Sequence, residues 1–300
     1  MPPSGAIHSD GAGNPMALAP HLNAYRDDLA DIALKDKVKA DRYASGTTYF
    51  VQTATAPMQQ KPGTGSRWGS ELIHGERVSV FEIADGFAWC QNMADRYVGY
   101  VPASCLTPEK AGEQQPGHKV TAIRAPLFPE GDLKTPIIGY RSFGSTLDLT
   151  GAEKNRFVET TTGAWIYSRH VAPVDTRVAD YVETARRFLE LPYIWGGRSC
   201  DGLDCSALVQ LALNLAGIAD CPRDTPDQKA GLGAALPPDT ARKRGDLAFF
   251  PGHIGIMLDE TLMIHANATH MAVTINPADD VAQWTLKSDG AGITGINRLD

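Results

Sequence analysis

The run CSALVQLALNLAGI at residues 205–218 constrains the fold of this chain most strongly. It is strongly apolar, is long enough for more than three helical turns, and contains Gly217 near its end, a residue type that commonly ends helices. A glycine-rich loop precedes it, and ADYVETARRFLELP, which ends at Pro192, predicts an earlier helix. The strand-like segments GDLAFF, HIGIML, TLMIHAN and MAVTIN follow. Helix first and then a run of strands predicts an α+β domain over residues 176–300.

The residues before this domain show a different pattern, in which short strands alternate with turns. Val78–Phe81, Phe87–Cys90 and Tyr97–Val101 are strand candidates, and their spacing predicts a small barrel over residues 46–108. A weak repeat of the pattern, again with Gly-x-Trp before a strand, spans residues 118–174 after a linker. We therefore expect two similar barrels, and the alternative is two unrelated β segments.

The first 45 residues form a separate segment. Residues 1 to about 20 are rich in Gly, Pro and Ala, and we expect them to be loosely ordered. Residues 21–45 are charged, and their apolar side chains are spaced roughly as on one helix face. This spacing predicts a short helical arm.

Composition narrows the class of partner and the compartment. The 300 residues carry a net charge of −7, which argues against nucleic acid or an anionic membrane as partner. Five cysteines are too few, and odd in number, for a disulfide framework, which fits a reducing compartment. Neither a signal-peptide pattern nor an apolar run of about 18 residues is visible, so the expected location is the cytoplasm. A signal that has been removed is the alternative.

Cys205 stands where the glycine-rich loop ends and the apolar helix begins. The partial positive charge of a helix N-terminus lowers the pKa of a thiol and favours the nucleophilic thiolate. The free amides of the first helical turn can also stabilise the oxyanion of a tetrahedral intermediate. This position predicts that Cys205 is a catalytic nucleophile.

Two downstream histidines are candidates for the base. His253 and His265 lie in strand-like segments joined by a turn at Asp259 and Glu260, so a hairpin would bring the two rings together. His253 would then accept the thiol proton, and His265 would orient its ring. The plainer alternative is two ordinary strand histidines.

A metal site is the main chemical rival. The soft ligands available are Cys200, Cys205, Cys221, His253 and His265. Their spacing contains neither paired C-x-x-C units nor H-E-x-x-H, which structural and catalytic zinc sites favour. We therefore expect no metal and no organic cofactor. The remaining cysteines, Cys90 and Cys105 among them, have no assigned role beyond packing.

Six motifs occur in order within residues 176–300: Y-x-W-G-G, G-x-D-C-S-A-L-V, P-R-D-T-x-x-Q, R-G-D-L-A-F-F, G-H-I-G-I-M and M-I-H-A. Together they resemble the NlpC-type cell-wall cysteine peptidases, which have a papain-like fold. The preceding β segments resemble the paired bacterial SH3-like domains of γ-D-glutamyl-L-diamino-acid endopeptidases. One departure is Ala207, where the family usually has glycine, and a methyl group there should be tolerated.

The resemblance implies roles for individual residues. Cys205 matches the nucleophile, His253 the general base, His265 the orienting residue, and Tyr193 a tyrosine that assists the oxyanion hole. Asp204 matches an aspartate that binds the free α-amine of an N-terminal L-alanine. The other implied substrate-binding residues are Ser206, Trp195, Arg223, Asp224, Tyr97 and Glu71.

Plainer interpretations exist for several of these residues. Asp204 is also a good helix N-cap, a role compatible with binding. Tyr193 fits a buried aromatic at a helix–loop corner, and Arg223 and Asp224 fit a loop ion pair.

The resemblance also implies a reaction. The expected substrate is a murein peptide such as L-Ala-γ-D-Glu-meso-diaminopimelate, cleaved at the γ-D-Glu–diamino-acid bond during peptidoglycan recycling. The first SH3-like barrel would close one end of the cleft and select peptides with a free N-terminus. The alternatives are an exported hydrolase of intact wall, a catalytically dead wall-peptide binding protein, and an acyl transferase.

Overall fold

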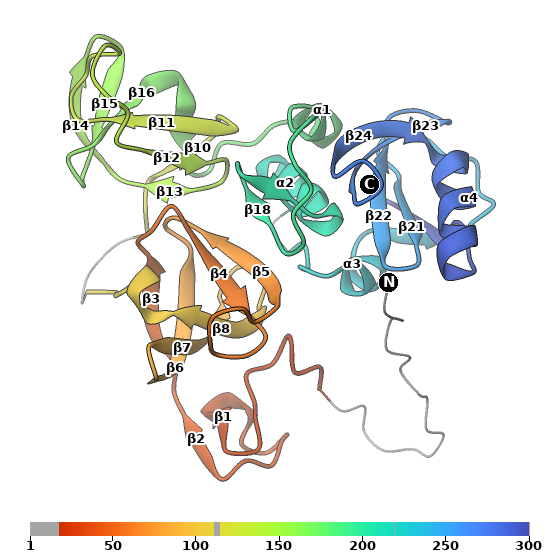
Figure 1. Ribbon diagram of the computed structural model, residues 1–300, viewed down its shortest axis with the longest axis horizontal. Helices are drawn as coiled ribbons and strands as arrows, with labels where there is room; N and C mark the ends of the chain where they lie inside the picture. The colour runs from red at the N-terminus through yellow and green to blue at the C-terminus, as the bar shows by residue number, and fades with distance from the viewer. Residues whose placement is uncertain (1–17, 111–114, 219, 300) are drawn as a thin grey trace.

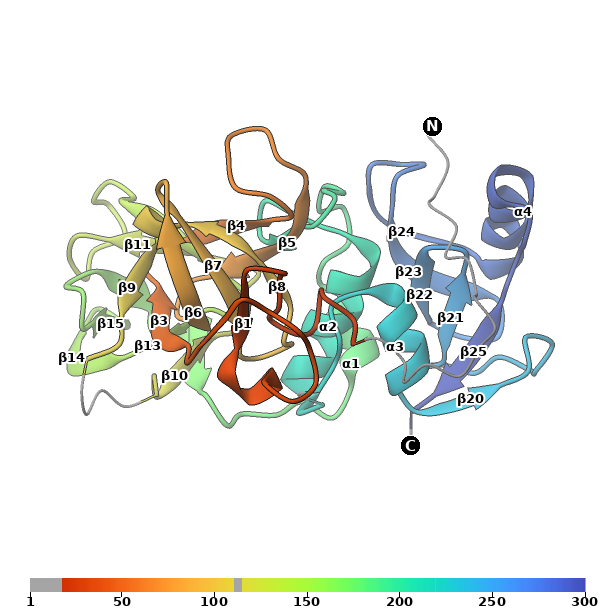
Figure 2. The same ribbon diagram turned by 90° about the horizontal axis from the view of Figure 1, so that it is seen from below.

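The computed structural model describes residues 18–110, 115–218 and 220–299. Figures 1 and 2 show two β-barrels at one end of the molecule and the C-terminal domain at the other, with helices α1 and α2 between them. The expectation of loose order for residues 1 to about 20 falls almost wholly outside the described residues. No helix within the described residues has the length and apolarity needed to cross a membrane.

The segment expected to be a helical arm is not helical. It contains strand β1 (Leu29–Asp31), one 3₁₀ turn (Ile32–Leu34) and strand β2 (Arg42–Ala44), which pairs parallel to β1. The prediction of a helix over residues 21–45 is therefore wrong.

Packing against the first barrel explains this difference. Ala24 and Leu29 are buried in one apolar cluster with Trp89 of the barrel. The Arg26 guanidinium lies 4.3 Å from the centre of the Trp89 ring and forms an ion pair with Glu82 at 2.6 Å. These contacts need an irregular chain that wraps the barrel, and they outweigh the weak helical periodicity.

Barrel 1 is a seven-stranded sheet in the order β5-β4-β8-β7-β6-β3-β9. Its strands are β3 (Thr47–Val51), β4 (Thr55–Gln59), β5 (Trp68–Ile73), β6 (Arg77–Ala84), β7 (Phe87–Asn92), β8 (Val98–Pro102) and β9 (Leu106–Pro108). The three strands expected from alternation in this segment are confirmed as β6, β7 and β8. Inward-facing apolar side chains such as Met58, Leu72 and Val78 are fully buried and form its core.

Barrel 2 consists of two small sheets, in the orders β13-β10-β17 and β12-β11-β16-β15-β14. Its strands are β10 (His118–Val120), β11 (Arg124–Phe128), β12 (Gly139–Ser142), β13 (Thr146–Leu147), β14 (Leu149–Lys154), β15 (Phe157–Thr160), β16 (Trp165–Tyr167) and β17 (Val171–Pro173). Its separate core includes Val120, Leu127 and Ile166.

The C-terminal domain has helices beside an antiparallel sheet in the order β20-β25-β21-β22-β23-β24. Its helices are α1 (Tyr181–Arg186), α2 (Cys205–Ala216), α3 (Thr225–Gly231) and α4 (Ala278–Asp289). Its strands are β18 (Arg198–Ser199), β19 (Gly202–Leu203), β20 (Ala234–Leu236), β21 (Leu247–Phe250), β22 (His253–Met257), β23 (Leu262–Asn267), β24 (Ala272–Pro277) and β25 (Gly295–Arg298). The helix-then-strands order and the α+β class are confirmed.

Helices α1 and α2 show how the local sequence determines where a helix begins and ends. Helix α2 begins after Asp204, whose side chain accepts a hydrogen bond from the Ala207 amide, and ends at Gly217 with φ 91°. Helix α1 is shorter than expected, because the chain turns after Arg186 and Glu190 adopts φ 69°. Ten side chains of α2 are buried, so this helix forms the centre of the domain core.

Candidate active site

Cys205 is the first residue of α2 and is 8% exposed. Its Sγ lies 3.8 Å from Thr225 Oγ1, at the start of α3. The backbone amide of Ile254 in β22 also faces the sulfur. The predicted nucleophile therefore lies between two helix starts and the beginning of the strand that His253 opens.

The two predicted histidines meet as expected. His253 Nε2 lies 2.7 Å from His265 Nδ1, and β22 and β23 pair as an antiparallel hairpin with Ile256 opposite Ile264. His265 is 1% exposed. The alternation of histidine with apolar residues in both strands thus brings the two rings to the same face of the sheet.

A chain of hydrogen bonds beyond His265 determines which nitrogen of His253 is free. His265 Nε2 lies 3.1 Å from Asn276 Oδ1, which also accepts a hydrogen bond from the Thr274 hydroxyl at 2.7 Å. His265 Nε2–H therefore donates to Asn276, and its Nδ1 accepts from His253 Nε2–H. The remaining lone pair of His253 is on Nδ1, where it can accept a proton.

Sequence analysis missed Asn276 and Thr225. Asn276 lies on β24, and its local signal is an asparagine two residues after Thr274, the residue that pairs with His265 across the sheet. Thr225 belongs to the P-R-D-T-x-x-Q motif, which supplied the family match without a role for the threonine.

The burial of this site favours neutral groups. Burial, and secondarily the Asp204 carboxylate, raises the pKa of Cys205 to about 11. Burial, and secondarily His265, lowers the pKa of His253 to about 3. The expectation that the helix N-terminus lowers the thiol pKa is thus not met, because desolvation outweighs the helix. A neutral thiol and a neutral imidazole suit a mechanism in which His253 removes the proton as the sulfur attacks.

The start of α2 and a nearby tyrosine offer hydrogen-bond donors that can stabilise an oxyanion. The amides of Cys205 and Ser206 lie in the first turn of α2 and have no acceptor among the described residues. Tyr193 packs against the same core, and its phenol interacts electrostatically with Cys205 and Asp204. Burial chiefly raises the pKa of the Tyr193 phenol, so this group stays protonated and can donate a hydrogen bond.

The Asp204 carboxylate is paired with an arginine and also caps the N-terminus of α2. Its oxygens accept hydrogen bonds from the Gly196 and Ala207 amides, the Ser206 hydroxyl and two Arg223 nitrogens. The Arg223–Asp204 ion pair is bidentate, with a shortest distance of 2.5 Å. A carboxylate with five donors and a matched charge has little capacity left for a ligand amine.

Arg223 differs from its expected role. It is 1% exposed, and its Nε donates to Ser70 Oγ of barrel 1 at 2.9 Å. Its ion-pair partner is Asp204, whereas the plainer interpretation was a loop pair with Asp224. Because the guanidinium is enclosed by protein groups, it connects barrel 1 to the start of α2.

Barrel 1 also contributes side chains that face the site. Tyr97 is 8% exposed, and Asp224 lies at its hydroxyl. Burial first, and then Asp224, raises the pKa of the Tyr97 phenol. Burial also raises the pKa of the Asp224 carboxyl, in spite of Arg223 nearby. Tyr97 and Asp224, which come from different domains, are thus brought together as expected.

Glu71 and Trp195 occupy different environments. Glu71 is buried, its Oε2 accepts a hydrogen bond from the Arg198 amide at 2.9 Å, and burial raises its pKa. This carboxyl group is therefore part of the contact between barrel 1 and the C-terminal domain. Trp195 is 69% exposed on the loop before Cys205 and is free to contact a ligand.

Comparison with known proteins agrees with this geometry. The NlpC/P60 family matches residues 190–287, and the bacterial dipeptidyl-peptidase SH3 domain matches residues 59–106. The chain carries an NlpC/P60 cysteine peptidase domain. An NlpC/P60 family protein from Bacillus cereus has the same fold, with a TM-score of 0.68 and 22% identity over 84% of this chain and 99% of that one.

Two curated relatives extend the match beyond the peptidase domain. Dipeptidyl-peptidase 6 of Lysinibacillus sphaericus is 26% identical over 263 residues, which cover 81% of this chain and 96% of the relative. The γ-D-glutamyl-L-lysine dipeptidyl-peptidase of Bacillus cereus is 34% identical over 230 residues, which cover 70% and 65%. The likeness therefore includes the barrels.

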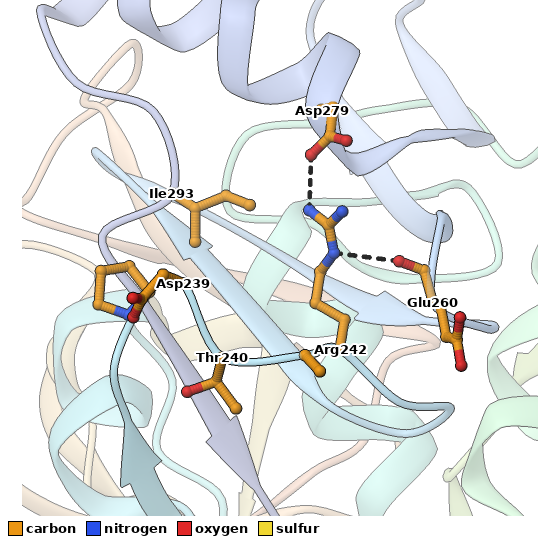
Figure 3. Close-up of a pocket in the computed structure, with 8 residues that line it drawn as sticks. Asp239, Thr240, Arg242, Glu260, Asp279 and Ile293 are labelled. Carbon is orange, nitrogen blue, oxygen red and sulfur yellow. Dashed lines mark hydrogen bonds and ion pairs between the residues drawn. The ribbon is translucent and has the colours of Figure 1, made fainter.

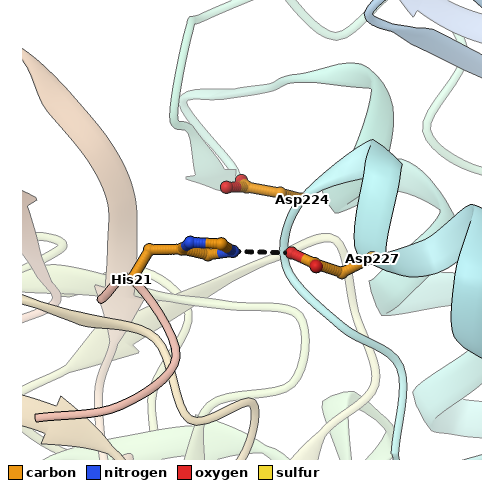
Figure 4. Close-up of side chains that lie close together, drawn as sticks. All are labelled: His21, Asp224 and Asp227. Carbon is orange, nitrogen blue, oxygen red and sulfur yellow. Dashed lines mark hydrogen bonds and ion pairs between the residues drawn. The ribbon is translucent and has the colours of Figure 1, made fainter. Parts of the chain in front are cut away.

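A group of metal-ligand type lies next to the peptidase site. His21 Nε2 is 2.8 Å from Asp227 Oδ2, with Asp224 beside them (Figure 4), and the donor atoms of all three lie within 4.8 Å of one another. His21 reaches α3 from the segment before barrel 1, and its ring centre is 6.0 Å from that of Tyr97. The hydrogen bond with Asp227 already accounts for the position of His21.

A second pocket of the NlpC/P60 domain lies apart from the predicted catalytic residues. In Figure 3, Arg242 donates to the Asp279 carboxylate at 2.7 Å and to the Glu260 carbonyl at 3.1 Å. No predicted site residue is in its lining. The Arg242 guanidinium is already occupied by these two bonds, which connect its loop to α4. We therefore interpret this pocket as a structural feature of the surface.

Proposed function

We propose that this protein hydrolyses the γ-D-Glu–diamino-acid bond of murein peptides that carry a free N-terminal L-alanine. The observation that carries the proposal is the contact of Tyr97 from barrel 1 with Asp224 beside the catalytic cysteine. A barrel that supplies a side chain there limits how far a peptide extends beyond the site. The names of the Bacillus relatives, γ-D-glutamyl-L-lysine dipeptidyl-peptidases, support the same bond and a cut after the second residue.

The chemistry proceeds through a thioester. The Cys205 sulfur attacks the γ-carbonyl carbon while its proton passes to Nδ1 of His253. The oxyanion is held by the amides at the start of α2, with Tyr193 as a further donor. The imidazolium returns the proton to the leaving amine of the diamino acid, and water then hydrolyses the thioester with His253 again as base.

The free amine needs a carboxylate with unused capacity. Asp224 has no side-chain cap bond to its own helix and lies against Tyr97, so we assign the ammonium group chiefly to Asp224. Asp204 would act beside it indirectly, by holding Arg223 and the start of α2 in place, because Arg223 already occupies its oxygens. Glu71 would support this end of the site from within the contact between the two domains, since its carboxyl group is buried and accepts the Arg198 amide.

The other proposed substrate contacts have separate roles. Trp195 is exposed and offers an aromatic surface to the peptide. Ser206 and Arg223 act by holding Asp204, since both side chains are buried against it.

The reaction is tested with synthetic L-Ala-γ-D-Glu-meso-diaminopimelate, followed by mass spectrometry. We expect release of L-Ala-γ-D-Glu and diaminopimelate, and loss of release in Cys205→Ala. Cys200→Ala is the matched control, because Cys200 is five residues earlier in the same segment, and this variant should retain activity. Cleavage that survives in Cys205→Ala, or a cut after the first residue, would contradict the proposal.

We also propose that the reaction serves recycling in the cytoplasm. Recycled peptides are small and carry free N-termini, whereas stem peptides in intact wall are acylated there. Comparison of free peptide with purified intact peptidoglycan separates this role from that of an exported wall hydrolase. Activity on intact wall, or recovery of the native protein outside the cytoplasmic fraction, would favour the exported enzyme.

A further inference from the structure

A cavity of about 500 Å³ lies between the two barrels. Phe50, Gln52 and His74 line it from barrel 1, and Leu127 and Arg141 line it from barrel 2. None of the predicted catalytic or substrate-binding residues takes part in its wall. A volume of this size is in the range that holds small organic ligands.

Arg141, on strand β12, brings a positive charge to this cavity without forming an ion pair within the described part of the chain. Its hydrogen bond among the described residues is to the carbonyl of neighbouring Tyr140 at 3.1 Å, and no ion pair to it is present there. Burial lowers the pKa of its guanidinium. A half-buried cation without a counter-charge is unfavourable, so an anionic ligand would stabilise it.

His74 adds a polar group with a defined tautomer. Its Nδ1 lies 3.1 Å from the Gln52 carbonyl and 3.2 Å from the Thr53 carbonyl, so Nδ1 carries the hydrogen and donates to them. Burial, and secondarily Arg141, lowers the pKa of His74 to about 4, which keeps the ring neutral. The unprotonated Nε2 can then accept a hydrogen bond from a ligand, such as one from a peptide N–H.

Strand edges surround the same space. Thr107 of β9, Arg141 of β12 and Thr146 of β13 are in the wall, and each of these strands is at the edge of its sheet. Edge strands can present main-chain groups to an extended peptide, although the Thr146 amide already donates to the His74 carbonyl. The apolar parts of the wall suit an uncharged side chain.

The charge balance favours a monoanion. The wall contains one guanidinium, a neutral imidazole and the carboxylate of Asp148. A phosphate dianion would meet repulsion from Asp148, and it would leave the apolar wall uncovered. A carboxylate with an adjacent amide N–H matches both Arg141 and His74.

We propose that the cavity between the barrels binds the free C-terminal carboxylate of a short peptide, with Arg141 as its counter-charge. This site is separate from the peptidase site, and its occupation does not depend on the proposed hydrolysis. The two barrels together form it, because each contributes one of the two polar groups.

Calorimetric titration of the full-length Cys205→Ala protein with N-acetyl-L-alanyl-L-alanine tests this site. The C-terminal amide of the same dipeptide and inorganic phosphate are the comparison probes. We expect the carboxylate probe to bind at least about tenfold more tightly than the amide, with millimolar or better affinity. Arg141→Gln should remove that difference, and Arg141→Lys should retain part of it.

Each other outcome overturns the assignment. Equal binding of acid and amide, or no heat from either at about 5 mM, excludes a carboxylate site. Unchanged preference in a folded Arg141→Gln protein places the carboxylate elsewhere. Binding of phosphate but not of the dipeptide indicates an inorganic anion site. The comparison of acid with amide uses no Arg141 variant, so it decides the question even if Arg141→Gln fails to fold.

Discussion

The two barrels have similar sizes but are joined to the peptidase domain in different ways. Barrel 1 is held by buried charge: Arg198 of β18 forms an ion pair with Glu76 at 3.1 Å, and Arg198 Nη1 donates to the Glu71 carbonyl. Barrel 2 is held by uncharged contacts: Phe143 packs edge-to-face on Phe188 in the core of the C-terminal domain, the Cys200 amide donates to Ser142 Oγ, and an exposed arginine donates to a backbone carbonyl. Barrel 1 thus contributes to the candidate active site, whereas barrel 2 only packs against the peptidase domain.

This difference follows from what each contact costs when it is lost. Removing one partner of a buried ion pair leaves an uncompensated charge, whereas an exposed hydrogen bond is replaced by water. The charged contact therefore fixes barrel 1 in one orientation, and that orientation brings Tyr97 to Asp224. Barrel 2 contributes none of the predicted site residues.

The largest expected effect is on stability. Arg198→Met should lower the free energy of unfolding by about 3–5 kcal/mol, because Glu76 loses its partner inside the contact. Arg187→Met, which removes the exposed hydrogen bond from Arg187 to Thr121 of barrel 2, should lower it by about 1 kcal/mol or less. Urea unfolding of both variants measures the difference. Equal losses would contradict the contrast between the barrels.

Acid should weaken the interface between the barrels as well as the catalytic pair. The pKa values of His74 and His253 are lowered to about 4 and about 3, so the unfolded chain binds protons more readily than the folded one. Stability is then fully present above about pH 6.5 and falls as the pH drops toward these values. Each histidine should contribute roughly 1–2 kcal/mol of loss between pH 7 and 5.

The contribution of His74 can be separated from that of the catalytic histidine. In thermal unfolding at several pH values, the unfolding temperature of His74→Gln should fall less steeply below about pH 6.5 than that of the parent protein. His118→Gln is the matched control in barrel 2. If the loss of stability at low pH is the same in His74→Gln as in the parent protein, burial of His74 between the barrels does not contribute to that loss.

The smallest expected effect is catalytic and concerns one hydroxyl. Tyr97→Phe should lower kcat/KM for a free-amine peptide by roughly tenfold, because it removes the hydrogen-bonding group that faces Asp224 and leaves the ring in place. Tyr140→Phe, in barrel 2, should leave kcat/KM unchanged. Steady-state assays of the two variants compare the barrels directly, and an equal loss in both would mean that Tyr97 has no special role.

Local sequence patterns predicted the parts of the site that local structure builds. Cys205 at the start of α2, and the hairpin that joins His253 to His265, follow from hydrophobic periodicity and turn residues alone. The family resemblance added roles for Tyr97 and Asp224, which lie in different domains, so no periodicity connects them.

Contacts between segments that are far apart in the sequence could not be predicted from local patterns. The helical periodicity of residues 21–45 was outweighed by packing of Leu29 and Arg26 on barrel 1. The pairing of Arg223 with Asp204, and not with its neighbour Asp224, joins the segment before α3 to the start of α2. Burial of Cys205 depends on both the sheet and α3, so the direction of its pKa shift was equally beyond local reasoning.

The central claim is that barrel 1 makes the peptidase site selective for a free N-terminus. The most direct test measures kcat/KM for L-Ala-γ-D-Glu-meso-diaminopimelate and for its N-acetylated twin, in the parent protein and in Asp224→Asn. We expect the parent to cleave the free peptide with at least about a hundredfold preference, and Asp224→Asn to lose most of that preference. Equal cleavage of both peptides by the parent protein would contradict the claim and leave a peptidase whose barrel does not select its substrate.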